Sequence, residues 1–297
     1  MRSFVRMSGG VAAVALAGAA LTALAPGPAM AAGPRTIQVP CSATALASAI
    51  TVANGLGSAI LRLPTTCNYL VTTPATAADG LPIITGTVTL EGGPRTVITR
   101  ASASNFRLLE VAASGTLITS SVSVTGGKTA GLGGAILNGG RLVIDQGTFS
   151  GNTAGNGGAV SNSAGGTVRI TDALLTGNTT TGVGGGAIIN FATLTLDGTI
   201  VTGNTAPING GGLNTQSGGT SRISRSTFTR NTSGGLGGAI SNLGTTSLTG
   251  STVRLNKASS GGGIATGNTN VTLRDTSVVA NTPDNCNPAN TIPGCFN

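Results

Sequence analysis

The strongest pattern along the chain is a repeat of apolar and polar positions with a period of 24 to 28 residues. Each repeat contains one asparagine at a fixed place, and the steps between these asparagines are 26, 26, 27, 25 and 25 residues. The asparagines are Asn152, Asn178, Asn204, Asn231, Asn256 and Asn281. Self-similarity at such a period is typical of solenoids. The sequence therefore predicts coils stacked along one axis.

Three apolar columns run at fixed distances before these asparagines. The positions three and eight residues before them are wholly apolar, and the position ten before is a weaker column. Positions ten and eight enclose one usually polar residue, as in Leu194-Thr195-Leu196, which is the alternation of a strand with one buried face. A sustained 3.6-residue pattern is missing, which disfavours α-solenoids. The columns are Phe149, Leu175, Val201, Phe228, Val253 and Val278; Ile144, Ile170, Leu196, Ile223, Leu248 and Leu273; and Leu142, Val168, Leu194, Ser221, Thr246 and Val271.

Two further features predict corners and an interior ladder. A Gly-Gly pair followed by a small and an aliphatic residue recurs between the asparagines, and glycine suits a corner because it tolerates positive φ and close backbone approach. The recurrent asparagine fits an inward ladder of side-chain amides or a plain turn residue, and its constant register favours the ladder. The glycine segments are Gly133–Ile136, Gly157–Val160, Gly185–Ile188, Gly210–Leu213, Gly237–Ile240 and Gly261–Ile264.

These GGAI-type motifs, with FxxN-type motifs such as Phe149–Asn152, resemble the repeats of chlamydial polymorphic outer membrane proteins. The segments Leu81–Gly93, Phe106–Val111 and Ser121–Gly127 resemble the first coils of exported actinobacterial β-helix proteins. The resemblance covers about residues 35–297. It implies an all-β fold, a single-stranded right-handed parallel β-helix (β-solenoid). The motifs are specific for the fold and weak for function, because they occupy core and corner positions.

Both ends of the repeat region carry signals of a cover, which open strand edges require. Ser42–Asn54 predicts a short amphipathic helix over the first coil, with Gly55 as its stop signal. Its apolar face is Leu46, Ala49, Ile50 and Ala53. The predicted divisions are a signal peptide (1–31), an N-terminal cap with the first coil (32–80), parallel β-helix repeats (81–282) and a C-terminal disulfide cap (283–297).

The first 31 residues have the layout of a secretory signal peptide. Arg2 and Arg6 precede an apolar run at 11–24, and Ala29-Met30-Ala31 forms a small-x-small cleavage site. The alternative is a membrane anchor, but the run is shorter than the ~20 residues that span a bilayer. We expect a secreted monomer, with no membrane span after signal removal, that is extracellular or associated with the cell wall.

The four cysteines, in an exported chain, predict two disulfides. Three connectivities are open. Cys41 and Cys67 lie near the start of the mature chain and Cys286 and Cys295 at its end, so local pairing is favoured. A zinc site has the wrong spacings and no histidine.

Candidate catalytic chemistry is sparse, since the chain has no histidine and only eight acidic residues. Asp145 and Asp197 share one register, about 9.6 Å apart at two coil spacings, with Asp172 and Arg169 on the coil between them. That separation is near the upper limit for an inverting glycosidase pair. The Asn-Thr-Asp, Asp-Asp and Gly-His-Gly motifs of polygalacturonase-like enzymes are absent, and Asp172 falls at a corner. No catalytic site, metal or cofactor is therefore favoured.

The C-terminal coils are the basic end. Residues 213–297 hold six basic and two acidic residues, a net charge of +4. The candidate binding residues are Arg222, Arg225, Arg230, Arg254 and Lys257. Such a surface suits anionic polymers, whereas specific nucleic-acid binding lacks interleaved aromatic residues.

The sequence thus favours an exported, non-catalytic surface, matrix or adhesion-type protein that binds anionic wall polymers or polysaccharide. The alternative is an extracellular polysaccharide lyase or glycoside hydrolase of the pectin-degrading, pectin lyase-like β-helix type. Acids that converge in a cleft would distinguish the enzyme from the scaffold.

Overall fold

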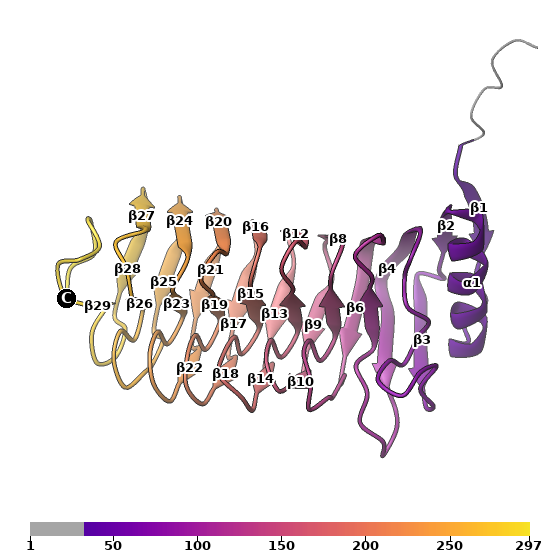
Figure 1. The fold of residues 1–297 in the computed structure, drawn as a ribbon, viewed down its shortest axis with the longest axis horizontal. Coiled ribbons are helices and arrows are strands. Elements are labelled where there is room, and N and C mark those ends of the chain that lie inside the picture. Colours follow the sequence, from indigo (N-terminus) through magenta and orange to yellow (C-terminus); the bar gives the residue numbers. More distant parts are fainter. Residues whose placement is uncertain (1–32) are drawn as a thin grey trace, which may run out of the picture. The chain divides into compact units, whose positions relative to one another are not determined.

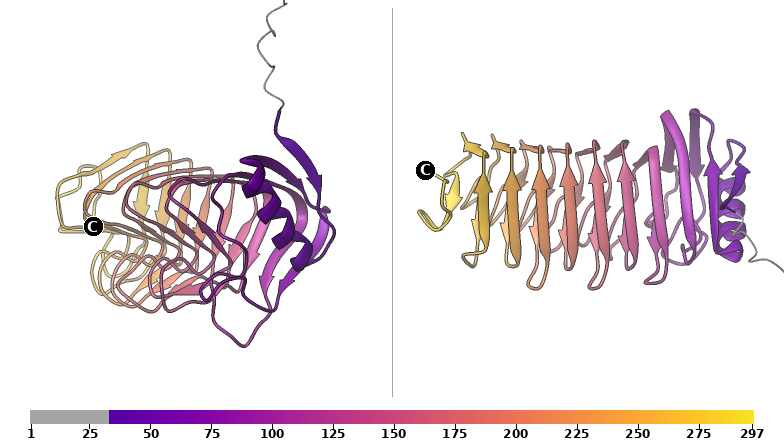
Figure 2. Two further views of the ribbon diagram at one scale, coloured as in Figure 1. Left: turned by 45° about the vertical axis from the view of Figure 1, so that its right-hand side comes forward. Right: turned by 90° about the horizontal axis from the view of Figure 1, so that it is seen from above.

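The computed structural model describes residues 33–297, and the predicted signal peptide lies outside these residues. Residues 34–297 form one compact unit. This unit is a β-solenoid of about ten turns in which every strand pairing is parallel (Figures 1 and 2). The predicted parallel β-helix is therefore confirmed.

Three sheets run along the solenoid axis. The long sheet has seventeen strands, and most coils contribute two of them; the short sheet has eight strands and the corner sheet has four. The long sheet contains β1 (Arg35–Gln38), β2 (Ser58–Arg62), β3 (Thr66–Val71), β4 (Thr87–Arg100), β6 (Thr116–Thr125), β8 (Arg141–Asp145), β9 (Thr148–Ser150), β12 (Thr167–Thr171), β13 (Leu174–Thr176), β16 (Thr193–Asp197), β17 (Ile200–Thr202), β20 (Thr220–Ser224), β21 (Thr227–Thr229), β24 (Thr245–Thr249), β25 (Thr252–Arg254), β27 (Val271–Arg274) and β28 (Ser277–Val279). The short sheet contains β5 (Leu109–Val111), β7 (Ile136–Asn138), β11 (Val160–Asn162), β15 (Ile188–Asn190), β19 (Leu213–Thr215), β23 (Ile240–Asn242), β26 (Ile264–Thr266) and β29 (Cys286–Asn287). The corner sheet contains β10 (Thr153–Ala154), β14 (Thr179–Thr180), β18 (Thr205–Ala206) and β22 (Thr232–Ser233).

The predicted apolar columns form the core of the solenoid. Residues three positions before the asparagines are buried in all six coils, and so are those ten positions before. The column eight positions before is buried except at Leu273, in the last coil, which is partly buried. In-register stacking continues each column from coil to coil, as at Val201, Phe228 and Val253.

The recurrent asparagines form the predicted inward ladder. Asn152, Asn178, Asn204 and Asn231 are fully buried, and each Nδ2 donates to the Oδ1 of the next coil's asparagine at 2.9–3.0 Å. Each Oδ1 also accepts the backbone N–H of the preceding ladder residue, as Asn204 does from Asn178. The ladder therefore satisfies its own buried amides, which removes the cost of burying them.

A second polar ladder lies under the short sheet and was not predicted. Asn138 donates to Asn162, and Asn162 donates to Asn190, both at 2.8 Å. Asn190 then donates to Ser221 Oγ, which lies 2.8 Å from Thr215 Oγ1. This explains why serine interrupts the weaker apolar column, because its hydroxyl continues the ladder.

Helix α1 (Ala43–Leu56) covers the N-terminal end of the core (Figure 2). Ser42 is its N-cap, and the four predicted apolar residues are the buried ones. The predicted stop at Gly55 was wrong: the helix runs to Leu56 and Gly57 ends it with a φ of 76°. A left-handed φ after the last turn favours glycine. No helix in the described part of the chain is long and apolar enough to cross a membrane.

Both disulfides pair as predicted. Cys41–Cys67 joins the segment before α1 to β3, and Cys286–Cys295 closes the tail. In the tail, Cys286, Ile292 and Cys295 are buried against the core. The tail adds a strand to the short sheet but none to the long sheet. The C-terminal cover is therefore partial.

Candidate functional site

The outer face of the long sheet carries the candidate acids and two of the candidate bases. From β6 to β28, each coil of the long sheet bends at a position with positive φ, and the β8–β9 coil has two such residues, Gln146 and Gly147. Asp172 (φ 50°) occupies this bend on one coil and Arg225 (φ 47°) on a later coil. The structure thus agrees with the prediction that Asp172 marks a corner.

The three candidate carboxylates lie on adjacent coils without converging. Asp145 and Asp197 flank Thr171 in register, so their backbones are about 9.6 Å apart at two strand spacings. Asp172 lies one residue beyond Thr171, at the bend. Within residues 33–297, no group of three histidine, cysteine or acidic side chains is placed to hold a metal ion.

Asp197 is bound to a residue that sequence analysis placed among the candidate bases. Its Oδ2 lies 2.6 Å from Arg225 Nη2, and its Oδ1 accepts a hydrogen bond of 2.7 Å from Ser224. The Arg225 side chain is 71% exposed above a carboxylate that is 16% exposed. Arg225 therefore covers Asp197 and compensates its charge. One of the candidate catalytic acids is thus bound to one of the candidate binding bases.

A shallow groove of about 390 Å³ runs along the bend across successive coils. Ser121, Gln146 and Asp172 contribute polar groups, and Leu174 and Ile200 contribute apolar groups. Of the three candidate acids in the described chain, only Asp172 lines this groove. Arg169 is exposed on β12, in register with Val143 and Thr195. The arrangement offers no pair of carboxylates facing each other across a cleft.

The five candidate bases are all exposed and separate into two groups. Arg222 lies on β20 and Arg225 at the bend, on the outer face of the long sheet. Arg230, Arg254 and Lys257, called here the corner cations, lie around the corner that follows β21 and β25. Arg254 pairs in register with Thr229, and Lys257 pairs with Thr232.

The corner cations occupy two adjacent coils within a few residues of the ladder. In the described residues, none of the three lies in an ion pair. Their charges are therefore available to a ligand, in contrast to that of Arg225.

A buried ionic cluster near the N-terminal coils was missed by sequence analysis. Arg107 Nε lies 2.8 Å from Asp79 Oδ1, but the groups are too poorly aligned for a hydrogen bond, so the contact is ionic. Glu110 Oε2 lies 3.8 Å from the same nitrogen. Arg107 Nη1 also donates to the carbonyl of Leu132, and Thr76 donates to Asp79.

The cluster raises the pKa of Glu110. Burial is the main cause, and the neighbouring Asp79 carboxylate adds to it, while Arg107 opposes it. The groove along the bend is not lined by these residues, and the cluster fastens the 72–80 loop to the next coil through the Asp79–Arg107 pairing. The Arg107–Glu110 spacing of three residues was the available signal, but Asp79 is brought in by the fold.

Two stretches of the chain, residues 146–163 and 225–243, match the Chlamydia polymorphic membrane protein repeat family. Each stretch begins at the bend, passes a ladder asparagine and ends beyond a short-sheet strand. No curated protein and no solved structure matches the chain. The repeats and the β-solenoid together fit a β-helix protein with polymorphic membrane protein-like repeats.

Proposed function

We propose that this β-helix repeat protein is an exported, non-catalytic surface or adhesion-type protein that binds an anionic wall polymer or polysaccharide. The matching repeats support a surface role, and the two disulfides are compatible with export. Cleavage of residues 1–31 as a signal peptide is part of this proposal.

The corner cations carry the proposal. Arg230, Arg254 and Lys257 present three exposed positive charges on neighbouring coils, free of carboxylates in the described chain. Coils repeat every ~4.8 Å, so charges on successive coils can follow a linear polyanion along the axis. Arg222 extends the basic surface onto the long sheet, whereas Arg225 contributes less because Asp197 compensates it. Each exposed contact is weak, so affinity depends on their sum.

The test is binding of the purified protein to immobilised polygalacturonate and to teichoic acid. Binding should fall steeply as salt rises, because the Debye length shrinks from about 10 Å at 0.1 M to about 3 Å at 1 M. Replacing Arg230, Arg254 and Lys257 by serine should abolish binding. The control with equal charge change, Arg95, Arg141 and Arg169 to serine, should retain most of it.

Replacing Asp145, Asp172 and Asp197 by asparagine should leave binding intact or strengthen it. Equal losses in the corner and control variants would show that net charge alone acts and would contradict a site at the corner. Release of sugar fragments by the wild-type protein, abolished by Asp145→Asn, would overturn the proposal in favour of an enzyme.

A further inference from the structure

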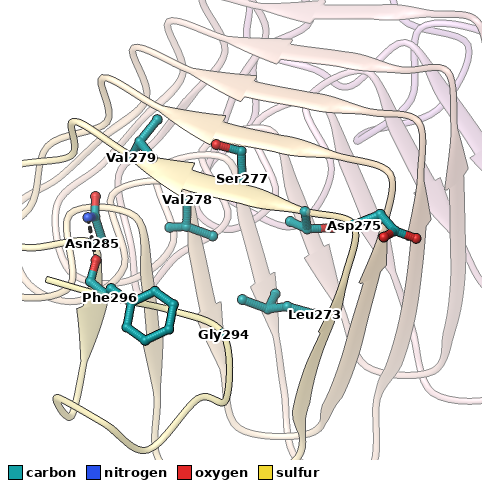
Figure 3. A pocket seen from close by; sticks show the side chains of 9 residues that line it. Leu273, Asp275, Ser277, Val278, Val279, Asn285, Gly294 and Phe296 are labelled. Atoms are coloured by element: carbon teal, nitrogen blue, oxygen red, sulfur yellow. Dashed lines mark hydrogen bonds between the residues drawn. The ribbon is translucent and has the colours of Figure 1, made fainter.

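The C-terminal end of the solenoid leaves one sheet edge open. Within residues 33–297, β27 and β28 are the last strands of the long sheet, and they pair on one side only, with β24 and β25. The short sheet is extended at the same end by β29, which pairs with β26. The tail therefore adds a strand to the short sheet only, and its residues Gly294 and Phe296 lie beside Leu273 and Val278 of the unpaired long-sheet edge (Figure 3).

The peptide groups of Leu273 and Val278 point toward this open edge. The carbonyl of Arg274 accepts from Gly250, and the N–H of Ser277 donates to Ser251, so both bond toward the preceding coil. Backbone groups alternate in direction along a strand, so those of the adjacent residues point the other way. An edge with free donors and acceptors is a template for a further strand.

Apolar side chains surround the same edge. A depression of about 590 Å³ is lined by Leu273, Val278, Val279 and Phe296 (Figure 3). Phe296 is 78% exposed and Val279 is 47% exposed. Leu273 is the one position of its core column that the described chain leaves partly buried. These apolar side chains alternate with Asp275, Thr276, Ser277 and Asn285 in the lining, so the edge offers both apolar and polar groups to a partner.

The two ends of the solenoid differ in how their edges are protected. At the N-terminal end, β1 lies between Pro34 and Pro40 and carries Arg35, while α1 covers the core. Proline and charge on an edge strand oppose pairing, and a head-to-tail contact would in addition form open filaments. The C-terminal edge therefore has its best complement in the same edge of another copy.

We propose that two copies of this protein associate through their C-terminal ends about a two-fold axis, with the β27–β28 edge of one pairing antiparallel with that of the other. This assembly differs from the monomer that the sequence predicts. It is independent of the proposed polymer binding, because the corner cations are not part of the edge.

A two-fold axis beside Asp275 and Thr276 pairs inward-facing residues of one copy with inward-facing residues of the other, and outward-facing residues with outward-facing ones. Leu273 then lies opposite Val278 of the second copy, both inward, and the two exchange backbone hydrogen bonds. Thr272 lies opposite Val279 on the outer face, which covers that exposed valine. Arg274 reaches the Asp275 carboxylate of the second copy along the diagonal. Apolar contact and backbone pairing are thus self-complementary, and each Asp275 carboxylate has an arginine of the other copy on the diagonal.

Sedimentation equilibrium of the purified protein from about 1 μM to about 1 mM tests the proposal. We expect a monomer–dimer equilibrium with no larger species. Asp275→Arg places like charges across the axis and should weaken the dimer at least about tenfold. The double swap Arg274→Asp with Asp275→Arg should restore it.

Other coils of the solenoid already carry arginine at the bend position and aspartate at the strand position, so Asp275→Arg and Arg274→Asp are both compatible with the fold. Arg225 occupies the bend position of Asp275 with the same φ of 47°, and Asp197 occupies the strand position of Arg274. Asp172→Arg, an identical change at an interior bend, is the control and should leave association unchanged. A protein that stays monomeric over the whole range, a dimer insensitive to Asp275→Arg, or a swap that fails to restore it would overturn the proposal.

Discussion

Phe228 shows how a single side chain is fixed by stacking. Its ring is fully buried, with Val201 and Val253 in register on the neighbouring coils. Phe228→Ala should lower the free energy of unfolding by about 3–5 kcal/mol, because it leaves a cavity that rigid coils cannot close. Denaturant titration measures this, and Ile200→Ala, at a 46% exposed position, should stay within about 0.5 kcal/mol of wild type. Near-wild-type stability of the Phe228 variant would contradict the inward register.

Glu110 should make stability fall as pH rises on the acid side. Burial and Asp79 raise its pKa in the folded protein above the ordinary value of 4.5. As pH rises, the unfolded chain therefore releases this proton before the folded protein does. The stability that the protonated Glu110 contributes is fully present below the ordinary pKa and is lost as pH rises through the raised pKa of the folded protein. Glu110→Gln should gain stability relative to wild type between pH 4 and pH 7. Denaturant titrations at both values test this.

The control for that experiment is Glu91→Gln, which removes an exposed carboxylate paired with Arg62. The control should stay close to wild type in both titrations, because an exposed ion pair of this kind contributes at most about 1 kcal/mol. A Glu110→Gln variant that loses stability relative to wild type as pH rises would contradict the pKa direction.

The core columns were predictable because each recurs at a fixed distance from an asparagine and is nearly uniform in type. The Asp197–Arg225 pair was not, since it joins residues 28 apart and depends on the positive φ of Arg225 at the bend. The second ladder escaped prediction because Thr215 and Thr266 replace asparagine on two coils. A pattern search for one residue type misses a column whose members share only hydrogen-bonding capacity.

At the scale of elements, the asparagine ladder joins strands that are individually too short to be stable. Asn204 accepts from the backbone and side chain of Asn178 and donates to Asn231 and to the carbonyl of Leu175. Asn204→Ala should cost about 1–3 kcal/mol for each buried partner left unpaired. Thr205→Ala, at the exposed next residue, is the control in the same denaturation assay. A loss below about 0.5 kcal/mol would show that the ladder amides are replaceable by water.

Element boundaries followed the sequence less closely than element types. Gly55 follows the last residue of the amphipathic pattern, where a glycine usually ends a helix, yet it lies inside α1. The stop lies at Gly57, directly before β2, and Asn54 in the last turn bonds to Ile83 and Thr85 in the segment that precedes β4. Tertiary contacts therefore decided between two glycines that the sequence could not separate.

At the scale of the whole molecule, the two disulfides protect ends that have no neighbouring coil. Cys41–Cys67 spans 26 residues and Cys286–Cys295 spans 9. In the chain-entropy model, replacing the first pair by serine should cost about 3–4 kcal/mol and the second about 2–3 kcal/mol. Thermal denaturation of the two double variants tests this order. A larger loss from the second pair would show that the tail stabilises the solenoid by packing rather than by loop closure.

Six successive coils carry the ladder asparagine at the same place, so each of them has the same interior and could replace another. An in-frame gain of about 78 base pairs, one repeat, would add a complete coil, and a loss of the same length would remove one. Either change would leave the ladder and the core columns continuous. Each added coil would move the basic end about 4.8 Å farther from the N-terminal helix. The distance between the two ends of the solenoid can therefore change in steps of one coil, while the interior of each coil stays the same.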